Sequence, residues 1–532
     1  MSPPPSSPSP YRRPHLTLSP LDPTTLPEAI DVSDNTAALA AVDTVIAAGP
    51  FTDTWESLSG YETPLWFRDA KFGIFVHWGA FSVPAFHNEW YPRNLYKPGS
   101  TAFEHHVATY GPQSQFGYKD FLPYFTMEKF EPTDWVGLFR RAGAQYVVPV
   151  AEHHDGYAMY PTERSRWSTV QIGPKRDLLG DLLGAVDDAW LVRGVSSHRA
   201  EHWFYMNGGL NYDSDVRDPA YLDLYGPALR KEMNPTERFL EDWLLRTVEV
   251  IDAQKPQVIY FDAGIEEPSF EPYLRRLAAY YYNRAAEWGR EVVINYKWDA
   301  FRTGSAVVEV ERGTMNAIMP FAWQADTAMS RTSWSWIPNH DYKSSKDLIA
   351  ELADVVSKNG NLLLNVGPRS DGLIPSEEVR LLEDIGAWLA VNGEAIYGTR
   401  PWTVCGEGPT RAAAGHFADQ GSHIEYGVED FRFTTMEEVG HEYVYAIALA
   451  PAEDGHVRVR NFGADNGLFD RDIVDVRVLG HVGDLEWTRT GTVLDVVLPE
   501  DLPTTAGGPV VRVEIAPEVV EQRVDFFHGI WL

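Results

Sequence analysis

Three stretches decide the fold class: 257–264 (QVIYFDAG), 291–297 (EVVINYK) and 306–313 (AVVEVERG). Each is a short apolar run interrupted or followed by polar residues. Continuous apolar runs of this length are typical of parallel strands that are covered on both faces. The segment 272–289 (PYLRRLAAYYYNRAAEWG) between them has helical periodicity. Strand and helix are therefore expected to alternate in this part of the chain.

The same alternation extends in both directions from this centre. Further apolar runs stand at 71–79, 145–154, 189–197, 317–324 and 361–368, and further helical patterns at 133–143, 235–254 and 345–360. About eight strands alternating with helices predict a (β/α)8-type, TIM-like barrel. A doubly wound α/β sheet is the alternative, but the Gly-rich phosphate loop that normally follows its first strand is absent from the sequence.

After about Tyr397 the hydrophobic pattern changes to a period of two, as in EYVYAIALA and PVVRVEIA. This alternation predicts a C-terminal antiparallel β-sandwich. Three parts follow: 1–50, a proline-rich leader and a short helical segment; 51–397, the barrel domain; and 398–532, the sandwich. The sandwich could bind carbohydrate or simply cover the flank of the barrel, and the sequence leaves both open.

Composition excludes several classes of protein. The 532 residues carry a net charge of −31, 44% are hydrophobic, and Cys405 is the single cysteine. A disordered chain, a disulfide-stapled mini-protein and a collagen-like fibre are excluded, and the acidic balance argues against nucleic-acid and anionic-membrane partners. The N-terminus lacks the apolar segment of a signal peptide, so a cytoplasmic location is expected.

Polar residues stand at the ends of the predicted strands. His77, His153, His154, Ser196, Ser197, Asp262, Glu311 and Asn365 each close or directly follow an apolar run. In a β/α barrel the carboxyl ends of the strands meet at one face, where active sites lie. The sequence therefore predicts a polar active site on that face.

Two carboxylates on this face point to glycoside hydrolysis. Asp262 and Glu311 follow strongly apolar strands, and burying a carboxylate is costly unless it is paired or has a task. Glycosidases use two carboxyl groups, one as nucleophile or base and one as acid. Glu309 on the same strand is the rival to Glu311, and a structural ion pair with Arg312 is the alternative for Glu311.

The histidines raise the alternative of a metal-dependent barrel hydrolase. His198 and His202 have i,i+4 spacing, but the first strand supplies His77 alone where such hydrolases typically have two histidines, and one cysteine excludes thiolate zinc sites. No metal and no cofactor are therefore expected. Histidines that hydrogen-bond a polyol fit better, with apolar walls from Trp78, Trp90, Trp203 and Trp323.

At these residues the chain resembles a known family, the α-L-fucosidases of glycoside hydrolase family 29. The matching blocks are 66–91 (WFRDAKFGIFVHWGAFSVPAFHNEWY), 151–160 (AEHHDGYAMY), 259–264 (IYFDAG) and 351–375 (ELADVVSKNGNLLLNVGPRSDGLIP). They occur in the family's order and span roughly residues 60–400. The resemblance implies a barrel followed by a β-sandwich and release of terminal α-L-fucose from fucosylated carbohydrates by a retaining mechanism without metal or cofactor. A homo-oligomer is compatible with it.

The resemblance also implies roles for individual residues. It makes Asp262 the nucleophile that forms a covalent fucosyl-enzyme, and Glu311 is favoured as the acid/base. The residues implied to contact or wall the sugar are His77, Glu89, Trp90, His153, His154 and Arg312, and Trp203 and Trp323 are added here as aromatic walls.

The sequence departs from the family pattern at two places. Many members have a Trp-Glu pair whose Glu has been assigned as acid/base, and Gln324 follows Trp323 here. An amide cannot exchange a proton as the mechanism requires. Gln324 therefore raises the alternative of a fucose-binding protein that has lost catalysis. At the second place, members of the family often have a Tyr before the serine, whereas Val195 or Ser196 stands here, so the linkage preference is left open.

Overall fold

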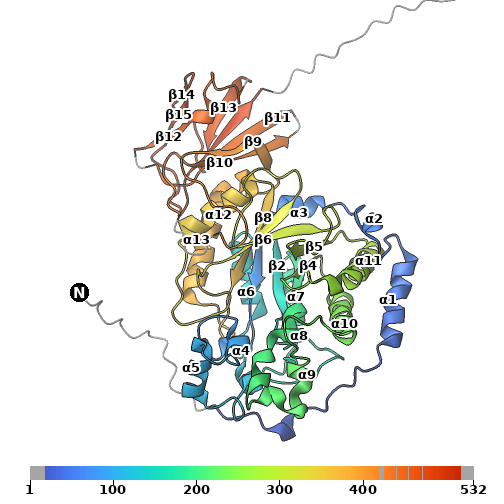
Figure 1. Ribbon diagram of the computed structural model, residues 1–532. Coiled ribbons are helices and arrows are strands. Elements are labelled where there is room, and N and C mark those ends of the chain that lie inside the picture. The colour runs from blue at the N-terminus through green and yellow to red at the C-terminus, as the bar shows by residue number, and fades with distance from the viewer. Residues whose placement is uncertain (1–17, 419–423, 439, 453, 470, 517–532) are drawn as a thin grey trace, which may run out of the picture.

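The computed structural model describes residues 18–418, 424–438, 440–452, 454–469 and 471–516, and its centre is a closed barrel of parallel strands (Figure 1). The strands are β1 (Phe72–Val76), β2 (Tyr146–Glu152), β3 (Val192–Ser197), β4 (Val258–Phe261), β5 (Val293–Lys297), β6 (Val307–Glu311), β7 (Trp323–Ala328) and β8 (Gly360–Val366). Each pairs with its neighbour in sequence order, and β1 pairs with β8 to close the barrel. The predicted TIM-like barrel is confirmed.

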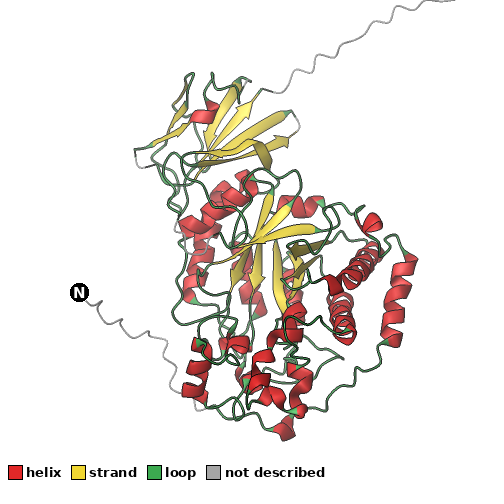
Figure 2. Ribbon diagram, in the orientation of Figure 1, coloured by secondary structure: helices red, strands yellow, loops and turns green. Residues whose placement is uncertain are grey.

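Helices surround the barrel (Figure 2). The longer ones are α1 (Thr36–Ala48), α5 (Thr101–Tyr110), α6 (Pro132–Arg141), α7 (Leu178–Asp188), α10 (Glu237–Gln254), α11 (Glu271–Trp288), α12 (Ser345–Ser357) and α13 (Ser376–Asn392), and the shorter ones are α2 (Trp55–Leu58), α3 (Leu65–Ala70), α4 (Tyr91–Asn94), α8 (His202–Tyr205) and α9 (Leu222–Tyr225). Helix α12 begins with a capping box, because the side chains of Ser344 and Asp347 each accept the other's backbone N–H. None of the helices in the described residues is long and apolar enough to cross a membrane.

The position of β7 differs from the prediction. The apolar run at 317–324 predicted the strand, but most of that run is a loop, and β7 continues through polar residues to Ala328. Pro320 lies in the loop. The strand includes Gln324 and Asp326, which are buried although polar. Hydrophobicity alone therefore placed this strand too early in the chain.

Helix α1 packs against the outside of the barrel. The Asn283 amide on α11 donates to the carbonyl of Val45 at 3.3 Å, and its oxygen accepts the backbone N–H of Phe51 at 2.7 Å. Residues 36–48, which the sequence grouped with the leader, thus cover the barrel's outer surface. The proline-rich residues 1–17 lie outside the described part, and the domain boundaries at 50 and 397 stay predictions.

The C-terminal part contains two antiparallel sheets. Their strands are β9 (Arg400–Glu407), β10 (Phe431–Glu438), β11 (His441–Ala448), β12 (His456–Val459), β13 (Ile473–Val478), β14 (Trp487–Arg489), β15 (Leu494–Val497) and β16 (Val510–Ile515). One sheet has the order β13-β16-β11-β10-β9 and the other β12-β15-β14. Side chains of both sheets, such as Val444 and Val457, share one apolar core, so the predicted antiparallel β-domain is confirmed. In Figure 1 it lies next to α12, far from α4 and α8, which follow β1 and β3.

Candidate active site

A cavity of about 300 Å³ opens at the carboxyl end of the barrel strands, where the sequence predicted a polar site. It is lined by the predicted residues His77, Glu89, Trp90, His153, His154, Asp262, Glu311 and Arg312. It is also lined by Asn88, His198, Glu201, Tyr260, Ala263, Lys297, Asp326, Arg331, Thr332, Ser333, Trp334 and Phe417. The barrel therefore brings together side chains that are up to several hundred residues apart in the sequence.

Lys297 connects the two predicted carboxylates. Its Nζ, at the end of β5, donates to Asp262 Oδ1 and to Glu311 Oε2, each at 2.6 Å. The two carboxylate oxygens therefore lie no farther apart than twice that distance. Retaining glycosidases hold their two carboxyl groups about 5–5.5 Å apart, whereas inverting enzymes leave a wider gap.

The pKa values of the two carboxyl groups are shifted in opposite directions. Burial raises the pKa of Asp262, but the positive charge of Lys297 and the hydrogen bonds from His154 and His198 outweigh it, so the pKa lies well below its ordinary value. Burial raises the pKa of Glu311 to about 7, against the opposing effect of Lys297. Near neutral pH, Asp262 is thus ionised while Glu311 can hold a proton.

Two histidines hold the second oxygen of Asp262. His154 Nε2 lies 3.1 Å and His198 Nδ1 3.2 Å from Asp262 Oδ2. The other ring nitrogen of His198 lies 3.0 Å from Ser196 Oγ, so the serine hydroxyl fixes the ring. Both oxygens of Asp262 have partners, which sets the orientation of the carboxylate.

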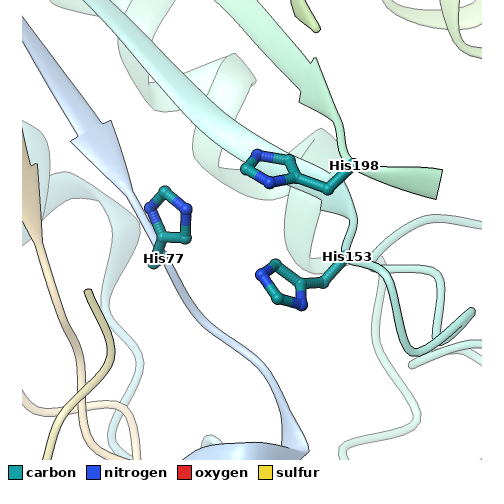
Figure 3. Close-up of side chains that lie close together, drawn as sticks. All are labelled: His77, His153 and His198. Atoms are coloured by element: carbon teal, nitrogen blue, oxygen red, sulfur yellow. The ribbon is translucent and has the colours of Figure 1, made fainter. Parts of the chain in front are cut away.

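Three imidazoles form one side of the cavity: His77, His153 and His198 (Figure 3). They come from the ends of β1, β2 and β3, and His77 Nδ1 donates to Asn365 Oδ1 at 2.7 Å. Burial lowers the pKa of all three, well below the ordinary value for His77 and His153, so the rings are neutral near pH 7. Neutral imidazoles can both donate to and accept from hydroxyl groups.

The same trio, and the group His154, His198 and Asp262, also meet the distance requirement for a metal ion. His202, considered with His198 as an i,i+4 ligand pair, belongs to neither group, because its Nδ1 bonds to the carbonyl of His154 at 2.7 Å. His153 and His154 follow the last residue of β2, and both side chains line the cavity.

Glu89 and Trp90, from the loop that follows β1, line the cavity. Glu89 Oε2 accepts the backbone N–H of Trp334 at 2.9 Å and lies 3.2 Å from Ser333 Oγ. The Trp90 ring stacks on the His154 ring with centroids 5.3 Å apart. The Arg312 guanidinium lies over the Trp334 ring, 4.7 Å from its centroid, and donates to the carbonyl of Ser330. These contacts fix the wall of the cavity.

Two predicted aromatic walls do not line the cavity. Trp203 on α8 is buried and packs edge-on against Phe204. Trp323 begins β7, at the opposite end of the barrel from the cavity, and its Nε1 donates to the carbonyl of Lys358 at 2.9 Å. Both are buried core residues. A tryptophan next to a functional motif can serve packing as well as binding, and its position in the sequence does not distinguish the two. Trp78, also considered as a wall, is buried and bonds to the carbonyl of Val150.

Glu309 and Gln324 lie inside the barrel below the cavity. Glu309 is fully buried, and its Oε1 accepts the backbone N–H of Asp326 at 2.7 Å. Gln324 Oε1 accepts the hydroxyl of Tyr146 at 2.8 Å. Neither side chain lines the cavity. Of the two glutamates on β6, Glu311 lines the cavity and Glu309 does not, and the glutamine of the altered Trp-Glu pair lies away from it.

Sequence reasoning missed Lys297 and Asp326. Lys297 ends an apolar strand in the same way as the histidines and carboxylates, so that signal was present. Asp326 was missed because β7 was predicted to end before it. Its Oδ2 accepts the Tyr260 hydroxyl at 2.7 Å. Phe417, which follows β9 in the chain, also lines the cavity, and no local sequence pattern predicts this.

The comparisons with known proteins agree with one another. A family model described as Alpha-L-fucosidase matches residues 38–394. The tissue alpha-L-fucosidase of Mus musculus is 31% identical over 453 residues, which cover 84% of this chain and 89% of that protein. The plasma alpha-L-fucosidase of Homo sapiens is 31% identical over 448 residues, covering 83% and 86%. The solved structure of Thermotoga maritima alpha-fucosidase in complex with fucose superposes with a TM-score of 0.67 at 29% identity, covering 87% of this chain and 100% of that one.

Proposed function

The chain belongs to the alpha-L-fucosidase family of glycoside hydrolases, and on that premise we propose that it is a retaining exo-enzyme that releases terminal α-L-fucose from fucosylated carbohydrates. One observation carries the proposal. Asp262 and Glu311 face the cavity on a shared Lys297 ammonium, with pKa values shifted in opposite directions. Paired titratable groups whose environments separate their pKa values are typical of acid/base assignments.

In the first step of the proposed mechanism, the ionised Asp262 carboxylate attacks the anomeric carbon of fucose. Glu311 donates its proton to the glycosidic oxygen, so that the leaving group departs as an alcohol. The bonds from Lys297 and from His154 and His198 hold the Asp262 carboxylate in position for attack. The product is a covalent fucosyl-enzyme and a free aglycone.

In the second step Glu311, now ionised, takes a proton from a water molecule that attacks the anomeric carbon. Asp262 leaves as a carboxylate, and fucose is released with its original anomeric configuration. A pKa of about 7 suits a group that must give and then recover a proton near neutral pH. The neutral rings of His77 and His153 can bind sugar hydroxyls throughout.

Glu201 is the remaining candidate for the acid/base. It lines the cavity, burial raises its pKa, and its Oε2 lies 3.9 Å from His154 Nδ1. It has no contact with the Lys297 ammonium among those described for the site, whereas Glu311 does. We propose Glu311 because it shares that cation with Asp262.

Product stereochemistry tests the proposal. Proton NMR during hydrolysis of an aryl α-L-fucoside is expected to show α-L-fucose before mutarotation. Azide added to Asp262→Gly is expected to give the β-fucosyl azide, and azide added to Glu311→Ala the α-fucosyl azide, because azide then replaces the nucleophile and the water respectively. Initial release of β-L-fucose would contradict retention, and rescue of Glu201→Ala alone would move the acid/base role to Glu201.

The altered Trp-Glu pair motivated the alternative of a binding protein without catalysis. Gln324 accepts a hydrogen bond from Tyr146 inside the barrel and does not line the cavity. A glutamine in place of a glutamate at this position therefore does not deprive the cavity of a proton donor. Binding of fucose by calorimetry without turnover of aryl fucoside would support that alternative. Loss of activity with EDTA and recovery with Zn²⁺ would support the metal-dependent one.

A further inference from the structure

The cavity is completed by a segment from the C-terminal part of the chain. Residues 408–418 follow β9 (Arg400–Glu407), and they contact the end of β6. The backbone N–H of Phe417 donates to the carbonyl of Glu311 at 2.7 Å, and that of Glu311 donates to His416 Nδ1 at 3.1 Å. Gly415 N–H donates to the carbonyl of Thr314 at 2.9 Å. The segment is thus paired with the strand end that carries the proposed acid/base.

This contact depends on a close backbone approach. A Cβ atom on Gly313 would lie 1.8 Å from the carbonyl oxygen of Gly415, so only glycine allows the two chains to come this close. The body of the C-terminal sheets lies beside α12 in Figure 1, whereas Phe417 of the segment 408–418 lines the cavity. The glycine at position 313 is therefore required by the backbone of a segment that lies about a hundred residues later in the chain.

The segment brings aromatic rings to the mouth of the cavity. Trp298 directly follows Lys297 and stacks on His416, with centroids 4.0 Å apart and planes at 26°. Phe417 lines the cavity beside Glu311. Trp298 is 43% and Phe417 39% exposed. Large aromatic side chains that stay this exposed next to a binding cavity mark a surface for a partner with an apolar face.

We propose that Trp298, His416 and Phe417 form the binding site for the leaving group, and that they stack on the CH-rich face of a pyranose ring. This rests on the proposed function. The glycosidic oxygen must lie next to the group that protonates it, so the leaving group lies on the Glu311 side of fucose. His416 and Phe417 are hydrogen-bonded to the backbone of Glu311 itself, and Trp298 stacks on His416. These three residues are therefore expected to contribute to the binding of a sugar leaving group and not to the binding of fucose itself.

The test compares two substrates that need the same proton donation. A disaccharide with fucose α-linked to galactose or N-acetylglucosamine presents a ring to the site, whereas methyl α-L-fucoside has a comparably poor leaving group and no ring. In Trp298→Ala and in Phe417→Ala, the ratio of kcat/KM for disaccharide to that for methyl fucoside is expected to fall about threefold to tenfold, the effect of one aromatic contact. The change is expected mainly in KM.

Trp190→Ala is the matched control. Trp190 is 91% exposed and has a positive φ of 61°, the same φ as Trp298, but it precedes β3 at the other end of the barrel. For Trp190→Ala, the ratio of kcat/KM for the disaccharide to that for methyl fucoside is expected to equal the wild-type ratio. Equal losses on both substrates in the two variants would show action through Glu311 and overturn the proposal, as would unchanged ratios in both. If the wild type hydrolyses neither substrate nor an aryl fucoside, the proposed function itself fails. Should Trp298→Ala not fold, Phe417→Ala decides alone.

Discussion

Two groups of polar residues form successive layers inside the same barrel, and they differ in their access to the cavity and in their charge. The upper tier is Asp262, Lys297 and Glu311, which line the cavity. The lower tier is Glu309, Gln324 and Tyr146, which do not. Glu309 and Glu311 are two residues apart on β6 and point to the same side of the strand, so the tiers are consecutive layers of the barrel interior.

The tiers differ in how their charges are balanced. In the upper tier, one ammonium contacts both carboxylates at 2.6 Å. In the lower tier, burial and the neighbouring Asp326 raise the pKa of Glu309 well above its ordinary value, so Glu309 is neutral. A buried carboxyl that keeps its proton avoids the desolvation cost of the charge. Two residues along β6 thus separate a tier that contains an ammonium and an ionised carboxylate and lines the cavity from a tier that is neutral and does not line it.

The largest expected effect belongs to Asp262 in the upper tier. Asp262→Asn keeps the shape but removes the nucleophilic charge, and kcat for an aryl fucoside is expected to fall on the order of 10⁴-fold. Steady-state kinetics with a thermal melt of the same sample check this. A kcat within tenfold of the wild type, in a variant that melts normally, would remove Asp262 from the reaction.

Glu311→Gln and Glu309→Gln compare the tiers directly. Glu311→Gln is expected to lower kcat/KM about 10²- to 10⁴-fold on a disaccharide, the range of general acid catalysis, and much less on fucosyl fluoride, whose leaving group needs little protonation. Glu309→Gln replaces a neutral carboxyl by a neutral amide of the same size, so the change is expected to stay within about threefold. The reverse order of the two losses would exchange the roles of the tiers.

Removal of the upper-tier cation is expected to move the pH profile. Lys297 lowers the pKa of Asp262 and of Glu311, so in Lys297→Met both values rise. The proposed mechanism requires an ionised Asp262 and a protonated Glu311, and therefore both limbs of the plot of kcat/KM against pH are expected to shift upward by about one to three pH units. Lys297→Arg keeps the charge and is the comparison. Limbs that stay in place in Lys297→Met would assign them to other groups.

Much of the upper tier was predictable because strand ends converge in a barrel. Asp262, Glu311 and the histidines each end or follow an apolar run, and this regularity identified the cavity before any geometry was known. Lys297 obeys the same rule. The tier to which a carboxylate belongs also follows from its position, because Glu309 is one layer deeper than Glu311 on β6.

The remainder depends on contacts that no local pattern carries. Asp326 joins the tiers, since its N–H reaches Glu309 and its carboxylate lies 4.0 Å from Lys297, but β7 was predicted to end before it. His416 bonds to Glu311 from 105 residues farther along the chain. Trp203 and Trp323 show the converse, because a tryptophan next to a motif gives no sign of the side on which its ring packs.

The smallest expected effect on activity is that of Gln324→Glu in the lower tier, which restores the Glu of the family's Trp-Glu pair. Gln324 pairs with Glu309 across β6 and β7, so the new carboxyl is buried beside another. Its pKa is expected to be raised in the folded state, and the variant therefore loses stability as the pH rises above the pKa of about 4.3 that Glu has in the unfolded chain.

Denaturant unfolding of Gln324→Glu at pH 5 and pH 8 measures this loss, with Glu309→Gln as the control that lowers the number of buried carboxyls instead. The free energy of unfolding is expected to be lower than that of the wild type by about 1–3 kcal/mol at pH 8, and by less at pH 5, where the protonated carboxyl still accepts the Tyr146 hydroxyl. Because residue 324 does not reach the cavity, kcat is expected to stay within about twofold. A tenfold gain in kcat would mean that the lower tier exchanges protons with the substrate, and the division between the tiers would then be wrong.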